Sequence, residues 1–148
     1  MATYTQIFYH IVYSTKYRNP YMDRSNRELL FKFIWGVLNK KKCHLYRING
    51  VRDHIHLFTH LHPSIALSDL VKDIKLASSA FIKEQNLFNN FNGWQDGYSA
   101  FTHTVKEKHR LIEYIKNQEI HHKKISYMLE LKTLLEEHGV RYNEKFLS

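Results

Sequence analysis

The chain has 148 residues, of which 43% are hydrophobic, so it suits one domain over residues 1–148 and argues against disorder. Its formal net charge of +8 favours a polyanionic partner, and no apolar run is long enough to span a bilayer. A single cysteine, Cys43, excludes an internal disulfide and a cysteine zinc cluster. We therefore expect a cytoplasmic, nucleoid-associated protein.

The first half of the chain predicts one helix among three strands. Residues 6–16 (QIFYHIVYSTK) are β-branched and aromatic, with apolar side chains on both faces, which predicts a central strand. Residues 23–42 begin with capping residues and continue with apolar residues at helical spacing. Residues 43–50 and 52–61 predict two strands, joined by a turn at Asn49-Gly50.

The second half adds a helix, a strand and two further helices. Residues 68–84 predict an amphipathic helix and residues 98–106 a strand, with a polar loop between them. Residues 107–124 and 126–139 predict the remaining two helices. The order β-α-β-β-α-β predicts an α+β, ferredoxin-like fold: an antiparallel sheet, helices on one face, and the first and third strands in the centre. The other face stays free for a ligand or for the added C-terminal helices.

One face of the strand predicted over residues 52–61 carries imidazoles. Side chains alternate along a strand, so His54 and His56 share a face, while Ile55 and Leu57 point toward the helices. The two imidazoles lie roughly 7 Å apart along the strand, and converging rotamers bring both to one metal ion. The alternative is a polar outer face. Because we place this face toward solvent, we expect His56→Ala to change stability little.

The helix predicted over residues 107–124 offers a matching element. Tyr114 and Gln118 are separated by four residues, so they lie on one helical face. A glutamine supplies a carbonyl oxygen as a metal ligand, and a tyrosine supplies a phenol that attacks a metal-bound phosphate. The alternative is that Tyr114 is one of ten tyrosines and packs half-buried against the sheet.

Several segments together resemble the HUH (His-hydrophobe-His) nucleases. The match is closest to the single-tyrosine transposases of small bacterial insertion sequences, the IS two-hundred group. The resemblance covers nearly the whole chain, and the segments that carry it are YHIVYSTKYRNP, DHIHLF, GWQDGYSAF, YIKNQEIHHKK and HGVRYNEKFL.

This resemblance implies a ferredoxin-like homodimer with an added C-terminal catalytic helix, acting on single-stranded DNA that carries hairpins at the transposon ends. Its ligands for Mg²⁺ or Mn²⁺ would be His54, His56 and Gln118. Tyr114 would attack the scissile phosphate and leave a 5′-phosphotyrosine and a free 3′-OH. Strand transfer exchanges bonds, so no nucleotide cofactor is expected, and the sequence has no P-loop pattern.

DNA contacts are harder to place from the sequence. Candidates for the DNA backbone are basic residues, each of which can equally be an ordinary solvated side chain: Lys16, Arg18, Arg52, Lys72 and Lys75. His121 is a further candidate, either for contact with a DNA phosphate or for proton transfer. Two other functions stay open. One is a non-catalytic, ferredoxin-like module that binds single-stranded nucleic acid. The other is a histidine-based phosphodiesterase that uses water as its nucleophile and does not depend on Tyr114.

Overall fold

The computed structural model describes residues 2–146, so the outermost positions of the predicted domain, 1 and 147–148, lie outside it. Its centre is a four-stranded antiparallel sheet in the order β2-β3-β1-β4. The strands are β1 (Phe8–Ser14), β2 (Leu45–Gly50), β3 (His54–His60) and β4 (Ser99–His103). The predicted ferredoxin-like fold is confirmed, with β1 and β3 in the centre.

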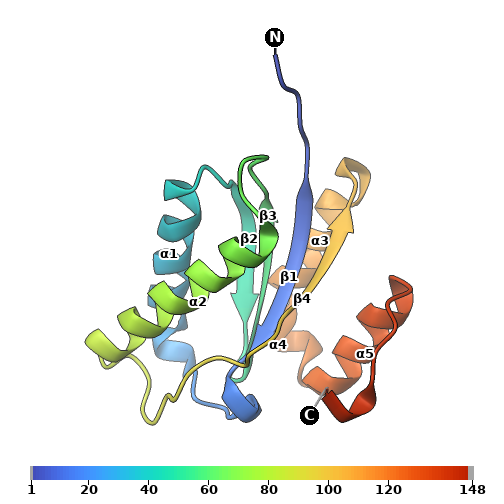
Figure 1. Cartoon of the computed structure of the whole chain (residues 1–148). Coiled ribbons are helices and arrows are strands. Elements are labelled where there is room, and N and C mark those ends of the chain that lie inside the picture. Colours follow the sequence, from blue (N-terminus) through green and yellow to red (C-terminus); the bar gives the residue numbers. More distant parts are fainter. Residues whose placement is uncertain (1, 147–148) are drawn as a thin grey trace.

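Two amphipathic helices cover one face of the sheet (Figure 1). They are α1 (Arg24–Lys40) and α2 (Leu67–Glu84), and they match the two predicted helices closely. The main core lies between them and the sheet, where Ile55 and Leu57 of β3 are fully buried with Ile34 and Ile74. This confirms that the residues between the histidines face α1 and α2. Within residues 2–146 no helix has both the length and the apolar character of a membrane span.

The opposite face is covered by three C-terminal helices, α3 (Lys108–Lys116), α4 (Gln118–His121) and α5 (Tyr127–Glu137) (Figure 1). Two small apolar clusters attach them. Phe8 and Phe58 hold α3 through Leu111 and Ile115. Val12 and Phe101 hold α5 through residues that include Leu131 and Leu134. The histidines of β3 lie on this same face, so the helices close over them.

The connection between β2 and β3 differs from the predicted Asn49-Gly50 turn. Strand β2 continues through Gly50, and residues 51–53 make the connection, closed by a hydrogen bond from Val51 N to His54 O of 3.1 Å. A Cβ at position 50 would lie 2.5 Å from His54 O, so the glycine is needed for close approach of the two strands.

The helix predicted over residues 107–124 is interrupted. Asn117 separates α3 from α4 with a non-helical ψ of 18°. Asparagine side chains compete with helical hydrogen bonding, which weakens the helix here. The side chain of Asn49 in β2 also donates to the carbonyl of Lys116 at 2.9 Å, which fixes the end of α3 against the sheet edge.

Candidate functional site

The two paired histidines of β3 lie beneath the C-terminal helices. His54 and His56 are both 0% exposed, so the expectation that they face solvent is wrong, because α5 and the turn before it cover them. Asp53 Oδ1 lies 2.7 Å from Nδ1 of His54, and Nε2 of His10 lies 2.8 Å from Nδ1 of His56. These contacts orient both rings and leave each Nε2 turned toward the helices.

A carboxylate from α5 lies among these imidazoles. Glu130 is 2% exposed, and its Oε1 is 2.9 Å from Nε2 of His56, 2.9 Å from Nε2 of His122 and 3.4 Å from Nε2 of His54. Each of the four residues offers one ligand atom, and the four atoms lie within 4.8 Å of one another. Imidazole and carboxylate groups are ordinary ligands for divalent metals. We call these residues the histidine–glutamate cluster, which can hold a metal ion.

Tyr114 and Gln118 reach the other oxygen of the same carboxylate. The Tyr114 hydroxyl donates to Oε2 of Glu130, and Nε2 of Gln118 donates to the same oxygen at 3.1 Å. The Tyr114 and His56 ring centroids are 6.0 Å apart. Gln118 is fully buried, and its Oε1 has no hydrogen-bond partner among residues 2–146. One chain thus brings together the paired histidines, the tyrosine and the glutamine.

Glu130 dominates the electrostatics of the cluster. Burial raises the pKa of this carboxyl, but hydrogen bonds from His122, His54 and His56 outweigh it and hold the pKa well below its ordinary value. Burial and the adjacent Glu130 carboxylate raise the pKa of Tyr114 far above its ordinary value of 10.0. A cation at the cluster would offset the negative charge and make the phenolate less unfavourable.

Four of the predicted DNA-contacting residues lie around the cluster. Lys16 and Arg18 line a hollow of about 550 Å³ that also includes Tyr127, whose ring contacts His54. Arg52 lines another hollow, of about 530 Å³, that reaches the cluster at its His122 side. His121, 35% exposed at its side chain, has its Nε2 3.4 Å from Glu130 Oε2.

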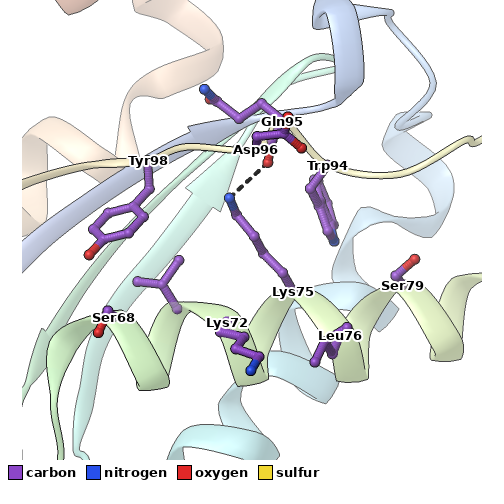
Figure 2. A pocket seen from close by; sticks show the side chains of 10 residues that line it. Ser68, Lys72, Lys75, Leu76, Ser79, Trp94, Gln95, Asp96 and Tyr98 are labelled. Atoms are coloured by element: carbon purple, nitrogen blue, oxygen red, sulfur yellow. Dashed lines mark hydrogen bonds between the residues drawn. The ribbon is translucent and has the colours of Figure 1, made fainter.

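Lys72 and Lys75 lie elsewhere, because α2 packs on the opposite face of the sheet. They line a hollow of about 380 Å³ between α2 and the segment before β4 (Figure 2). Lys75 Nζ points toward the segment before β4 and donates to the carbonyls of Gln95 at 2.8 Å and Gly97 at 2.6 Å. Burial lowers the pKa of Lys75 to about 8. The structure therefore does not bring these two lysines to the cluster.

Sequence reasoning did not single out Glu130, His10 or Asp53. Glu130 carries the clearest signal, because it lies on the buried stripe of α5 between Tyr127 and Leu131. An acidic residue on an apolar helix face is rarely buried without a partner. That pattern predicts a partnered carboxylate, although the partners themselves lie on β3 and are invisible to local periodicity.

Comparisons with known proteins identify the family of the chain. Residues 3–118 match the model of the family described as Transposase IS200 like. The chain is 27% identical over 115 residues to the transposase for insertion sequence element IS200 of Salmonella typhimurium, covering 74% of this chain and 75% of that protein. It is 24% identical over 118 residues to the ISDra2 transposase TnpA of Deinococcus radiodurans, covering 76% of this chain and 84% of that protein.

Solved structures share the fold. A candidate transposase from Deinococcus radiodurans superposes with a TM-score of 0.60 at 24% identity, covering 80% of this chain and 95% of that one. A REP-associated tyrosine transposase bound to a REP hairpin superposes with a TM-score of 0.59 at 16% identity, covering 84% of this chain and 76% of that one. Since the family model spans most of the chain, the protein belongs to the IS200-like transposases, a family of enzymes that cleave DNA and transfer its strands.

Proposed function

We propose that this chain nicks single-stranded DNA at hairpin-bearing transposon ends and transfers the strands through a 5′-phosphotyrosine on Tyr114. One observation carries the proposal. The Tyr114 hydroxyl and the imidazoles of His54 and His56 meet at the same buried carboxylate, although they come from elements far apart in the sequence. A tyrosine that only packed against the sheet would have no reason to converge with paired imidazoles.

The proposed cofactor is Mg²⁺ or Mn²⁺, held by His54, His56 and Gln118. The donor set supports this, because Gln118 keeps a buried carbonyl oxygen that has no hydrogen-bond partner among the described residues. Such an oxygen is costly to bury unless something binds it. When bound, the ion polarises a phosphoryl oxygen and spreads the charge that develops there.

The chain itself supplies the nucleophile and its surroundings. Attack by the Tyr114 oxygen forms an oxygen–phosphorus bond and breaks the bond to the 3′ oxygen, which leaves as a 3′-OH. A 3′-OH from another strand reverses the exchange and releases the tyrosine. The number of phosphoester bonds is unchanged, so no nucleotide cofactor is required. The hydrogen bond from Tyr114 to Glu130 aims the phenol before the DNA arrives.

We further propose a DNA hairpin as substrate and a homodimer as the active form. The net charge of +8 and the basic hollow lined by Lys16 and Arg18 suit a DNA backbone. A protein of the same fold is described as bound to a REP hairpin. Each chain has one proposed nucleophilic tyrosine, which can hold one DNA strand at a time, so joining two ends calls for two chains.

The test is an SDS-stable protein–DNA adduct. Parent chain, Mg²⁺ or Mn²⁺ and single-stranded DNA carrying the correct end hairpin should give the adduct, and EDTA should abolish it. Tyr114→Phe should lose the adduct and keep hairpin binding. The matched control is Tyr46→Phe, because Tyr46 packs against the same apolar cluster as Tyr114 and should cleave like the parent.

Other outcomes identify the competing functions. Cleavage that persists in Tyr114→Phe, without any adduct, would support a water-using phosphodiesterase. Hairpin binding that is indifferent to EDTA, with no cleavage by the parent, would support a binding module.

A further inference from the structure

Three imidazole nitrogens converge on one carboxylate oxygen in the histidine–glutamate cluster. Nε2 of His56, His122 and His54 lie 2.9, 2.9 and 3.4 Å from Oε1 of Glu130, and Nε2 of His54 lies 3.0 Å from Nε2 of His122. His122 comes from the turn between α4 and α5, and Glu130 from α5 itself. The resemblance to known transposases assigns a role to neither residue.

The contacts of Nδ1 in His54 and His122 indicate which ring nitrogen carries a hydrogen. Nδ1 of His122 lies 3.0 Å from the carbonyl of Ile125, and Nδ1 of His54 lies 2.7 Å from the carboxylate of Asp53. Both partners only accept hydrogen bonds, so each Nδ1 carries a hydrogen. In a neutral imidazole the other nitrogen then presents a lone pair. Two such lone pairs face each other at 3.0 Å, and either a proton on one of them or a metal ion between them removes the repulsion.

The spacing fits a small divalent ion. Ligand bonds of about 2.1 Å at right angles place neighbouring ligand atoms about 3.0 Å apart. The separations of 2.9, 2.9, 3.0 and 3.4 Å match the edges of such a coordination shell. The outer contacts match as well, since metal-binding histidines ordinarily hold their second nitrogen on a carboxylate or a backbone carbonyl.

The charge of Glu130 also suits a bound metal cation. Glu130 is a buried carboxylate whose side-chain partners within residues 2–146 are histidine, tyrosine and glutamine, with no lysine or arginine. Buried carboxylates are ordinarily paired with a cation or bound to a metal.

We propose that Glu130 and His122 are metal ligands alongside His54 and His56, so that α5 is part of the catalytic site. Oε1 of Glu130 binds the ion, and Oε2 holds the Tyr114 hydroxyl. The carboxylate thereby sets the distance between ion and nucleophile. The identity of the ion, Mg²⁺ or Mn²⁺, rests on the function proposed above. The assignment of the ligands does not.

Metal binding tests this without DNA. In a titration of free Mn²⁺ followed by electron paramagnetic resonance at pH 7.5, the parent should bind one ion per chain. Glu130→Gln keeps the shape and most hydrogen bonds but removes the charge, and it should weaken Mn²⁺ binding by at least ~10-fold. His122→Asn should do the same. Mn²⁺ should also raise the unfolding temperature of the parent but not of these variants.

Matched controls separate ligation from general charge effects. Glu137→Gln removes the same charge from an exposed site on α5, and His109→Asn removes an exposed histidine from α3. Both should bind Mn²⁺ like the parent. Circular dichroism confirms that each variant folds. If Glu130→Gln fails to fold, Mn²⁺ binding by His122→Asn decides the question, because His122 lies at the edge of the cluster.

Equal Mn²⁺ affinity in His122→Asn, Glu130→Gln and Glu137→Gln, or no Mn²⁺ binding by the parent, would overturn the inference. The two proposals fail separately. An Mg²⁺-dependent adduct on Tyr114, together with unchanged Mn²⁺ binding by Glu130→Gln, removes only the ligand assignment. Glu130-dependent Mn²⁺ binding without any adduct removes only the DNA chemistry.

Discussion

At the scale of single residues, His56 has a partner on each ring nitrogen and no contact with solvent. His10 lies against Nδ1 and Glu130 against Nε2. A buried polar group that loses its partner keeps the full cost of its desolvation. Removing His56 therefore affects two other buried groups, His10 and Glu130, so we expect it to cost more stability than removing a solvent-exposed histidine.

We expect His56→Ala to lower the free energy of unfolding by about 2–3 kcal/mol, because it opens a cavity, removes the hydrogen-bond partner of His10 and takes one of several partners from Glu130. Urea unfolding of the metal-free chain measures the change. His60 lies on the same face of β3 but is partly exposed, so His60→Ala should stay within ~0.5 kcal/mol of the parent. Equal effects of the two substitutions would contradict the burial argument.

The same residue should make stability depend on pH. Burial lowers the pKa of His56 from 6.5 to about 4. The unfolded chain therefore binds this proton first as pH falls, so the contribution is complete above pH 6.5 and is lost between pH 6.5 and 4. Its upper limit is roughly 3 kcal/mol.

Hydrogen bonds to Asp53 and Glu130 outweigh burial and raise the pKa of His54, which partly offsets this loss. Comparing the parent with His56→Gln in EDTA at pH 7 and pH 5 isolates the contribution of His56. The parent should lose more stability than the variant, and parallel losses would show that His56 is not the source.

At the scale of elements, α5 positions the carboxylate. Its apolar stripe packs against Val12 of β1 and Phe101 of β4, and Glu130 is adjacent to Leu131 on that stripe. The position of Glu130 relative to the histidines therefore depends on the apolar packing of α5 against β1 and β4.

Leu131→Ala should lower the free energy of unfolding by about 2–4 kcal/mol and also weaken Mn²⁺ binding, because α5 loses its fixed distance from β3. Leu129→Ala on the same helix should change neither, since Leu129 is 52% exposed. Unfolding curves and the Mn²⁺ titration measure both effects. Unchanged Mn²⁺ affinity in a destabilised Leu131→Ala would show that α5 does not set the geometry.

At the scale of the whole molecule, the cluster and Tyr114 belong to one chain. Helix α3 is attached to its own sheet through Phe8 and Phe58, and α5 through its own β1 and β4. We therefore predict that a second chain adds a second complete site and does not complete the first.

Mixing variants tests this arrangement. His56→Gln combined with Tyr114→Phe should form no adduct, because neither chain in a mixed dimer holds a whole site. Each variant mixed with parent should retain adduct formation, and differently tagged chains must show that subunits exchange. An adduct that appears only in the mixture would mean that chains exchange their tyrosine helices.

The sequence alone determined the features that depend on local periodicity. Alternation along residues 54–57 separated the histidines from Ile55 and Leu57, and the spacing of apolar residues located α1, α2 and α5. The same reasoning identified β1 as a central strand, because both of its faces are apolar. These features follow from strand and helix geometry, which near neighbours in the sequence fix.

Only the tertiary structure decided how the histidine face is covered and what lies beneath it. Glu130 is 74 residues away from His56, and no local pattern links them. The end of α3 is held by a side chain from β2, and the burial of His54 depends on segments folded back over β3. Contacts between distant segments form only when the apolar stripes of α3 and α5 pack onto the sheet. The burial of the histidines and the position of the Glu130 carboxylate therefore depend on tertiary packing.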